Sequence, residues 1–252
     1  RLVWTKMNQM RSINVRNIDA EAPTISVAGN LNAYGNSSQD SSPFLALLGA
    51  RLAITGNLRS GSKQNSGRML LKGSDEVNIS SSGNLVTAGN NGGVVEILSS
   101  HGAVTVAGAI MTNGESGRGG TIKINASQNI LMSNANLLAN GTTDGGLIIV
   151  ASNNGDVNFQ QSFIQTNGGA GVGGTILLSG VNNTFISSTE ISARGYIQGG
   201  SIKVGNDLAN QLIPFSRYTE IDLNSVLNSS QLNSNIQNNQ GAVKIFPSVV
   251  TN

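Results

Sequence analysis

The acidic side chains and the single histidine are the residues of this sequence with the clearest capacity for chemistry. His101 is the only histidine, and one imidazole cannot supply a histidine-based metal site or a triad that lacks a matching nucleophile and acid. Glycoside hydrolysis by the usual mechanism needs two carboxyl groups that flank the scissile bond. The 13 acidic residues are scattered, and Asp75-Glu76 is the only adjacent pair. We therefore expect His101 to be an exposed corner residue, and we expect no catalytic residue, no metal site and no enzymatic activity.

Residues 168–174 form the most glycine-rich run, Gly-Gly-Ala-Gly-Val-Gly-Gly. Calcium-binding nonapeptide repeats place aspartate after such glycines in series, and this run contains none. A phosphate-binding glycine loop opens a helix, whereas no helical pattern follows Gly174. The run therefore predicts a flexible corner, and we expect no cofactor.

Composition narrows the class of partner. The 252 residues carry 15 basic and 13 acidic side chains, for a net charge of +2, and contain no basic run. Nucleic-acid binding relies on clustered Lys and Arg, so we expect no nucleic-acid partner. No apolar run approaches the roughly 20 residues that cross a bilayer, so we expect no membrane span. Cysteine is absent, which excludes disulfides and thiolate metal sites.

The chain repeats with a period of 25–28 residues, and two markers follow the repeat. The first marker is a small residue that opens an alternating apolar run, at Ser42, Gly67, Gly93, Gly120, Gly146, Gly174 and Gly200. The second is an apolar residue followed two positions later by Ala, Ser or Thr, starting at Leu31, Leu58, Leu85, Ile110, Leu137, Ile164 and Ile191. Both markers keep phase over six steps, which indicates an internal repeat rather than chance.

Each unit holds three short segments of alternating apolar and polar residues, which is the pattern of strands with one buried face. A unit of this size without a helix cannot bury its apolar face alone, and stacking on the next unit solves that problem. We predict an all-β fold, a single-stranded parallel β-helix of about eight coils with three short strands per coil. Inward side chains should form columns, the first two being Met69, Val95, Ile122, Ile148, Ile176 and Ile202, and Leu71, Ile97, Ile124, Val150, Leu178 and Val204.

The coils are expected to run from residue 12 to residue 205. Residues 1–11 should cap the first coil or continue a preceding one, and the start at Arg1 in mid-pattern, without an initiator Met or a signal peptide, indicates a piece of a longer or processed protein. Residues 206–240 are rich in Asn and Ser and predict an insertion that serves as a loop, a cap or a partner-binding arm. Residues 241–252 should form a final strand and tail.

Two side-chain patterns lie outside the predicted core. Four asparagines share one phase just before the third strand, where stacked amides can hydrogen-bond along the rod and stabilise the corner: Asn30, Asn57, Asn84 and Asn136. Leu147, Ile149 and Leu177 point outward on adjacent coils and form a small apolar patch. Two interpretations of this patch stay open, a loop that covers it or a lateral interface with another chain.

The rhythm Gly-Gly-Thr-Ile-Lys-Ile-Asn-Ala at 119–126, followed by Leu-Leu-Ala-Asn-Gly at 137–141, resembles the shaft of filamentous haemagglutinin-like exoproteins. Gly-Gly-Ser-Ile-Lys-Val at 199–204 and Glu-Ile-Ser-Ala-Arg-Gly at 190–195 follow the same pattern. The resemblance covers roughly residues 12–205 and implies a right-handed parallel β-helix. Asn-Pro-Asn motifs, which mark the family's secretion domain, are absent from the sequence, so the resemblance implies shaft rather than export signal.

That family consists of large adhesins secreted by two-partner systems in bacteria. The resemblance implies an extracellular or cell-surface location and roles in attachment, biofilm or fibre formation. It implies a host or neighbouring-cell surface, or matrix polysaccharide, as partner, and an outer-membrane secretion partner for the full-length protein. No catalytic residue is carried over, because the family's shaft has none.

Two other functions remain open. A carbohydrate-active β-helix, such as a polysaccharide lyase, a hydrolase or a phage tailspike, would be favoured by acids clustered in a surface groove. A self-assembling extracellular filament subunit would stack end to end or side by side, so homo-assembly is a further expectation.

Overall fold

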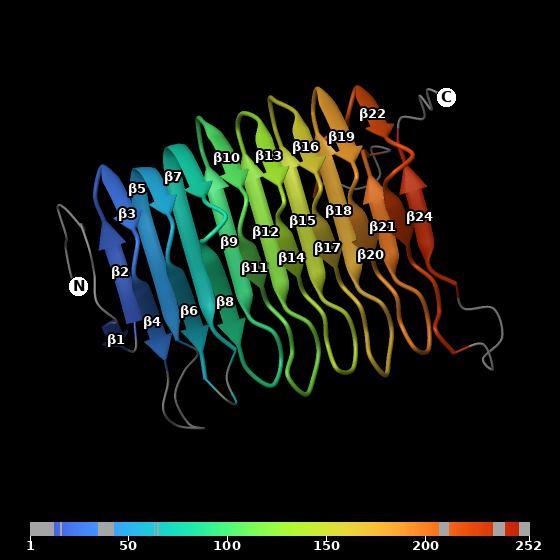
Figure 1. Cartoon of the computed structure of the whole chain (residues 1–252), viewed down its shortest axis with the longest axis horizontal. Helices are drawn as coiled ribbons and strands as arrows, with labels where there is room; N and C mark the ends of the chain where they lie inside the picture. Colours follow the sequence, from blue (N-terminus) through green and yellow to red (C-terminus); the bar gives the residue numbers. More distant parts are fainter. Residues whose placement is uncertain are drawn as a thin grey trace.

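The computed structural model describes residues 13–15, 17–34, 43–62, 64, 66–206, 212–233 and 240–246. Every regular element within these ranges is a β-strand, and the strands stand in rows along an elongated body (Figure 1). Strands from successive coils pair in parallel. The all-β parallel solenoid predicted from the repeat is therefore confirmed. Residues 1–11, expected as a cap or as part of a preceding coil, lie outside the described ranges.

The rod has three faces, and each face gathers equivalent strands from successive coils. The first face comprises β2 (Asn17–Glu21), β5 (Phe44–Ile54), β7 (Arg68–Ile79), β9 (Val94–Ser99), β12 (Thr121–Ala126), β15 (Leu147–Ser152), β18 (Thr175–Gly180), β21 (Ser201–Val204) and β24 (Ala242–Ile245). The second comprises β3 (Thr24–Val27), the second halves of β5 and β7, β10 (Ala103–Val106), β13 (Ile130–Ser133), β16 (Val157–Gln160), β19 (Asn183–Ser187) and β22 (Tyr218–Ile221). The third comprises β1 (Ile13–Val15), β4 (Asn30–Tyr34), β6 (Asn57–Gly61), β8 (Asn84–Ala88), β11 (Ala109–Met111), β14 (Asn136–Leu138), β17 (Phe163–Gln165), β20 (Glu190–Ser192) and β23 (Val226–Asn228).

Six regular coils run through the middle of the rod, slightly fewer than the eight or so that the repeat predicts. They are β5–β6, β7–β8, β9–β11, β12–β14, β15–β17 and β18–β20. The turns at both ends are less regular. β1 pairs with β4, so it belongs to the third face of an earlier turn, and β24 is the one described strand of the last turn.

Part of the segment 206–240, which was expected to be an insertion, continues the solenoid. Within it, β22 and β23 continue the second and third faces, with Ile221 next to Ile186 and Leu227 next to Ile191. The register places most of the extra residues of this turn between β21 and β22, and further extra residues between β23 and β24. β22 and β23 are short, and each has a single apolar residue at an inward position, Ile221 and Leu227, so the alternating pattern is weak there.

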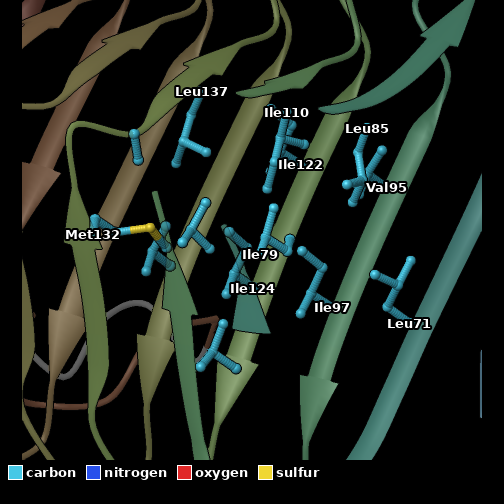
Figure 2. Close-up of a cluster of buried hydrophobic side chains, with 14 of the residues drawn as sticks. Leu71, Ile79, Leu85, Val95, Ile97, Ile110, Ile122, Ile124, Met132 and Leu137 are labelled. Carbon is cyan, nitrogen blue, oxygen red and sulfur yellow. The ribbon is translucent and has the colours of Figure 1, made fainter. Parts of the chain in front are cut away.

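The interior is built from columns of aliphatic side chains, as the repeat predicts. Met69, Val95, Ile122, Ile148, Ile176 and Ile202 are register partners in sequence, and so are Leu71, Ile97, Ile124, Val150, Leu178 and Val204. All twelve side chains are fully buried. Figure 2 shows side chains of all three faces meeting inside, with Ile124 from the first face, Met132 from the second and Leu137 from the third. Each buried aliphatic side chain stabilises the fold by about 1.5–3 kcal/mol relative to exposure.

The third face ends each coil on a small buried residue, which explains the Ala/Ser/Thr marker. The chain loops outward after this residue and returns on a glycine whose amide closes the loop, as in Gly174 N–H to Thr166 C=O at 2.6 Å. A Cβ on Gly174 would lie 2.7 Å from the Cβ of Thr166, so glycine and a small partner are both required. The hydroxyls of Thr87, Thr112 and Thr166 are buried there without a hydrogen-bond partner. These orphan hydroxyls cost stability.

Replacing Ile124 with Asp tests the inward column. An unpaired carboxylate in the apolar interior should lower the free energy of unfolding by about 4 kcal/mol or more, measured by urea denaturation. Lys123→Gln is the matched control, because the Lys123 side chain is half-exposed and its Nζ lies 3.8 Å from a Glu96 carboxylate oxygen. That control should change stability by less than about 0.5 kcal/mol. Equal unfolding midpoints for the two variants would contradict the inside–outside assignment.

Replacing Thr166 with Val should stabilise the rod by about 1 kcal/mol, because the variant keeps the shape and removes an unpaired buried hydroxyl. Ser162→Ala provides the contrast. The Ser162 hydroxyl accepts a bond from the Ala135 amide at 3.2 Å and donates to the Gln160 carbonyl at 2.9 Å. Its loss should destabilise by about 1–2 kcal/mol. Thermal denaturation that ranks the two variants in the opposite order would show that the hydroxyl pattern is misassigned.

Candidate functional site

The residues singled out for chemistry lie at one corner of the rod, between the first and second faces. His101 is exposed there, and its backbone amide donates to the Ser74 carbonyl of the neighbouring coil at 2.8 Å. Asp75 and Glu76 are exposed at the same corner, and Asp75 accepts a hydrogen bond from the Ser74 hydroxyl at 2.8 Å. No group of three His, Cys, Asp or Glu side chains that could hold a metal ion occurs among the described residues.

Other acids meet cations from adjacent coils. A Glu96 carboxylate oxygen lies 3.5 Å from the Arg68 guanidinium and the other 3.8 Å from Lys123. Asp144 accepts a bond from Arg118 Nε at 3.0 Å. Exposed pairs of this kind contribute only about 0.2–1 kcal/mol each. They link neighbouring coils, and none of them brings two carboxylates together.

A groove of about 790 Å³ opens at this corner over the first coils. Its lining combines exposed charged and hydroxyl side chains with a floor of small and apolar residues: Glu21, Ala22, Pro23, Leu48, Gly49, Ala50, Lys72, Ser74 and Ser100. The groove follows the rod axis across neighbouring coils. Such a surface can take an extended polar chain, with hydrogen bonds from the serines and from Lys72.

The groove results from a change in corner length. Leu47 and Leu52, the inward residues that flank this corner in β5, are five positions apart. The equivalent pair in β7 is six positions apart, and Ile97 and Val104 of the next coil are seven apart. The short corner leaves a step in the surface, and the longer corners of the next coils form the wall of the groove. The corner lengths can be counted in the sequence, but whether they form a groove depends on which coils lie side by side.

The predicted asparagine ladder is present in the first coils. Asn57 Nδ2 donates to Asn30 Oδ1 at 2.8 Å, and Asn84 Nδ2 donates to Asn57 Oδ1 at 2.9 Å. Ala109 is the next residue in register and interrupts the ladder. These side-chain amides form hydrogen bonds between adjacent coils, so they stabilise the corner as predicted.

A second ladder, which the sequence analysis missed, lies at the loops between the third and first faces. The carboxamide oxygens of Asn113, Asn140 and Asn167 accept the backbone amides of residues 140, 167 and 194 at 2.8, 2.7 and 2.7 Å. The spacing of 27 residues between successive asparagines is the sequence signal that could have predicted this ladder. These asparagines tie the protruding loops into one continuous edge along the rod.

The apolar patch of Leu147, Ile149 and Leu177 lies under the segment that precedes β22. Ile149 and Leu177 are each 4% exposed and pack with Ile213, which is 3% exposed. Leu147 packs against the same cluster and is partly buried. The Ser179 hydroxyl donates to the Pro214 carbonyl at 2.7 Å, which holds this segment to the first face. The structure thus matches the interpretation in which a loop covers the patch.

The carboxylate of Asp222 joins the last regular coil to the turn after it. It accepts hydrogen bonds from the Ser225 hydroxyl at 2.6 Å, the Ser187 hydroxyl at 2.8 Å and the Ser188 amide at 3.0 Å. These bonds lower the pKa of Asp222 from an ordinary 3.8 to about 2, with Ser225 the largest cause, followed by Ser188 and Ser187. A strongly shifted pKa often marks a functional group, but here the causes are hydrogen bonds inside the turn of Asp222, from Ser225, and from Ser188 and Ser187 of the preceding coil.

The position of Asp222 follows from the backbone at this corner. Asn134, Gln161 and Ser188 adopt positive φ angles of 56°, 49° and 48° at steps of 27 residues. The amides of Asn134 and Gln161 donate to carbonyl groups of the next coil, both at 3.0 Å. The Ser188 amide instead meets the Asp222 carboxylate. Asp222 therefore substitutes for a backbone acceptor, which makes its role structural.

The fold and these surfaces define a class, a parallel β-solenoid whose polar groups link neighbouring coils. Comparisons with known protein families, with curated proteins and with solved structures gave no match to this chain. At the level of fold, the solenoid agrees with a β-helical shaft. No helix with the length and hydropathy needed to cross a membrane is found in the described part of the chain.

Replacing Asp222 with Asn tests this inter-coil contact through pH. The native pKa is lowered to about 2, so the charged carboxylate stabilises the fold above about pH 4, and this contribution is lost as the pH falls through 2. Wild type should have the higher Tm at pH 6, and the difference from Asp222→Asn should shrink between pH 4 and pH 2. Glu190→Gln, an exposed change one coil away, controls for net charge. A Tm difference that stays constant from pH 6 to pH 2 would contradict the assignment.

Proposed function

We propose that this chain is a rigid β-helical segment of a bacterial surface protein of the filamentous haemagglutinin-like type. In this proposal it lies outside the cell and supports attachment, biofilm or fibre formation. The observation that carries the proposal is the use of polar groups. Asn30, Asn57, Asn140 and Asp222 all bond to a neighbouring coil, which suits a scaffold better than a reaction centre.

The geometry suits a shaft for a physical reason. Each coil adds about 4.8 Å of length and joins its neighbour through hydrogen bonds on three faces and through the packed columns. Bending or shearing the rod would disturb all of these contacts at once. A repeating unit of this kind spans distance with stiffness, and it can be lengthened without a new core.

The exposed surface supports contact with polar partners. Only 11% of the residues are charged, so the outer faces present many hydroxyl and amide side chains that can hydrogen-bond to sugars. Host or neighbouring-cell surfaces and matrix polysaccharide are therefore the partners of the proposal. An outer-membrane secretion partner for the full-length protein follows from the proposed family rather than from any contact described above.

The corner groove favours a second candidate, a carbohydrate-active β-helix. Its lining holds one carboxylate, Glu21, and one amine, Lys72, whereas the usual hydrolytic mechanism needs two carboxyl groups. Depolymerisation of a polysaccharide by the purified chain, lost in both Glu21→Gln and Lys72→Met, would establish this alternative and displace the shaft.

Surface labelling and attachment test the proposal directly. Antibodies raised against the purified chain should label intact cells of the producing bacterium, because an extracellular shaft is accessible without permeabilisation. Beads coated with wild-type chain should attach to cell or polysaccharide surfaces more than beads coated with the misfolding variant Ile124→Asp. An antibody against a cytoplasmic protein serves as the control for cell integrity. Labelling that appears only after permeabilisation would refute the proposed location.

A further inference from the structure

Five asparagines are followed directly by glycine, the pair of residues most open to spontaneous deamidation: Asn91, Asn113, Asn140, Asn154 and Asn167. In this reaction the backbone nitrogen of the glycine attacks the carboxamide carbon of the asparagine, and glycine has no Cβ to hinder the approach. A folded backbone slows the attack where hydrogen bonds hold these two groups in place. The hydrogen bonds of each site therefore determine which of the five can react in the folded chain.

Three of the sites are the asparagines of the second ladder, and they are locked between coils. Their carboxamide oxygens accept amides of the next coil. The amides of the glycines that follow them donate to carbonyls of the next coil, at 2.9, 2.9 and 2.8 Å for Gly114, Gly141 and Gly168. Each of these glycines also takes part in a parallel bridge between coils. The attack at these sites therefore requires the coils to separate.

Asn91 is exposed, yet it is held in the same way. Its Oδ1 accepts the amide of Arg118 in the next coil at 3.0 Å. The Gly92 amide donates to the Arg118 carbonyl at 2.8 Å. Exposure of the side chain is therefore not sufficient to make a site reactive.

Asn154 lacks this protection. It is exposed at the corner between β15 and β16 (Figure 1). The Gly155 amide donates at 2.9 Å to the hydroxyl of Ser152, which belongs to the same corner. Within the described part of the chain, no group of another coil bonds the Gly155 amide or the Asn154 Oδ1. A local change at this corner can therefore bring the two groups together while the flanking strands stay paired.

We propose that Asn154 is a site of spontaneous covalent modification in the folded chain, and that the Ser152 hydroxyl restrains the reaction by holding the Gly155 amide. The Gly155 nitrogen forms a bond with the Asn154 Cγ, and the Cγ–Nδ2 bond breaks. The nitrogen leaves as ammonia with the proton that the amide loses. Water then opens the cyclic succinimide at either carbonyl and gives Asp or isoaspartate.

The product changes the corner in two ways. A new carboxylate lowers the net charge of +2 by one. Isoaspartate also adds a carbon to the main chain beside the Asn154 carbonyl, which accepts a bond from Asn182 Nδ2 of the next coil at 3.1 Å. The modification therefore marks aged molecules at a contact between coils. It depends on the fold alone and goes beyond the proposed function.

Ageing of the purified 252-residue chain in neutral buffer tests the site. Cleavage after acidic residues places the five Asn-Gly sites in separate peptides, and mass spectrometry follows the conversion of each. In the folded chain, Asn154 should be converted at least about tenfold faster than any of the other four. In urea all five should react at similar rates, because each is followed by glycine.

Two variants test the cause. Ser152→Ala frees the Gly155 amide and should accelerate conversion of Asn154 by about two- to tenfold, the effect of one lost hydrogen bond. The other four sites of the same sample are the internal control, because a general loss of stability would accelerate them as well. Asn154→Gln should abolish conversion at this position and leave the other rates unchanged.

Two results would overturn the proposal. The first is a folded chain in which Asn154 reacts no faster than the other four sites. The second is a Ser152→Ala variant in which Asn154 gains no rate relative to those sites. Neither result bears on the labelling of intact cells, so failure here is distinguishable from failure of the proposed surface location.

Discussion

The fold depends on the in-register pairing of each coil with its neighbours. Equivalent residues then lie about 4.8 Å apart along the rod. Each side chain therefore lies next to the side chains at the equivalent positions of the two adjacent coils. Inside the rod, aliphatic residues gain packing contacts from this arrangement. At the corners, asparagine amides gain hydrogen bonds. Like charges would repel one another in this arrangement, and Lys123 avoids that cost because its register partners are Glu96 and Ile149.

Variation is confined to the corners by the same constraint. A strand residue cannot be added without shifting every column, whereas a corner can lengthen or shorten. The groove near Leu48 and the segment that places Ile213 over the first face are both effects of corner length. Glycine holds the tightest corners because the adjacent coil approaches closely: a Cβ on Gly120 would lie 2.1 Å from the Gly93 carbonyl oxygen. Surfaces that could recognise partners therefore lie at the corners.

The sequence predicts the repeated part of this structure well and the unrepeated part poorly. Columns such as Met69 to Ile202 follow from periodicity alone, because burial of one face leaves a period that is visible without coordinates. The groove and the role of Asp222 do not follow from that periodicity. They depend on differences between neighbouring coils, and a consensus pattern averages those differences away. Likewise, β22 and β23 have too few apolar residues for the pattern to reveal strands that tertiary pairing imposes.

Distances between spin labels along one outward column test the central claim most directly, and the absence of cysteine makes labelling simple. Arg68, Thr175 and Ser201 occupy one register line, with Ser201 one coil beyond Thr175. Paired labels should give a distance of about 19 Å for 68 with 175 and about 24 Å for 68 with 201, an increase of one coil spacing. Distances that do not grow with coil number would contradict a stacked parallel rod.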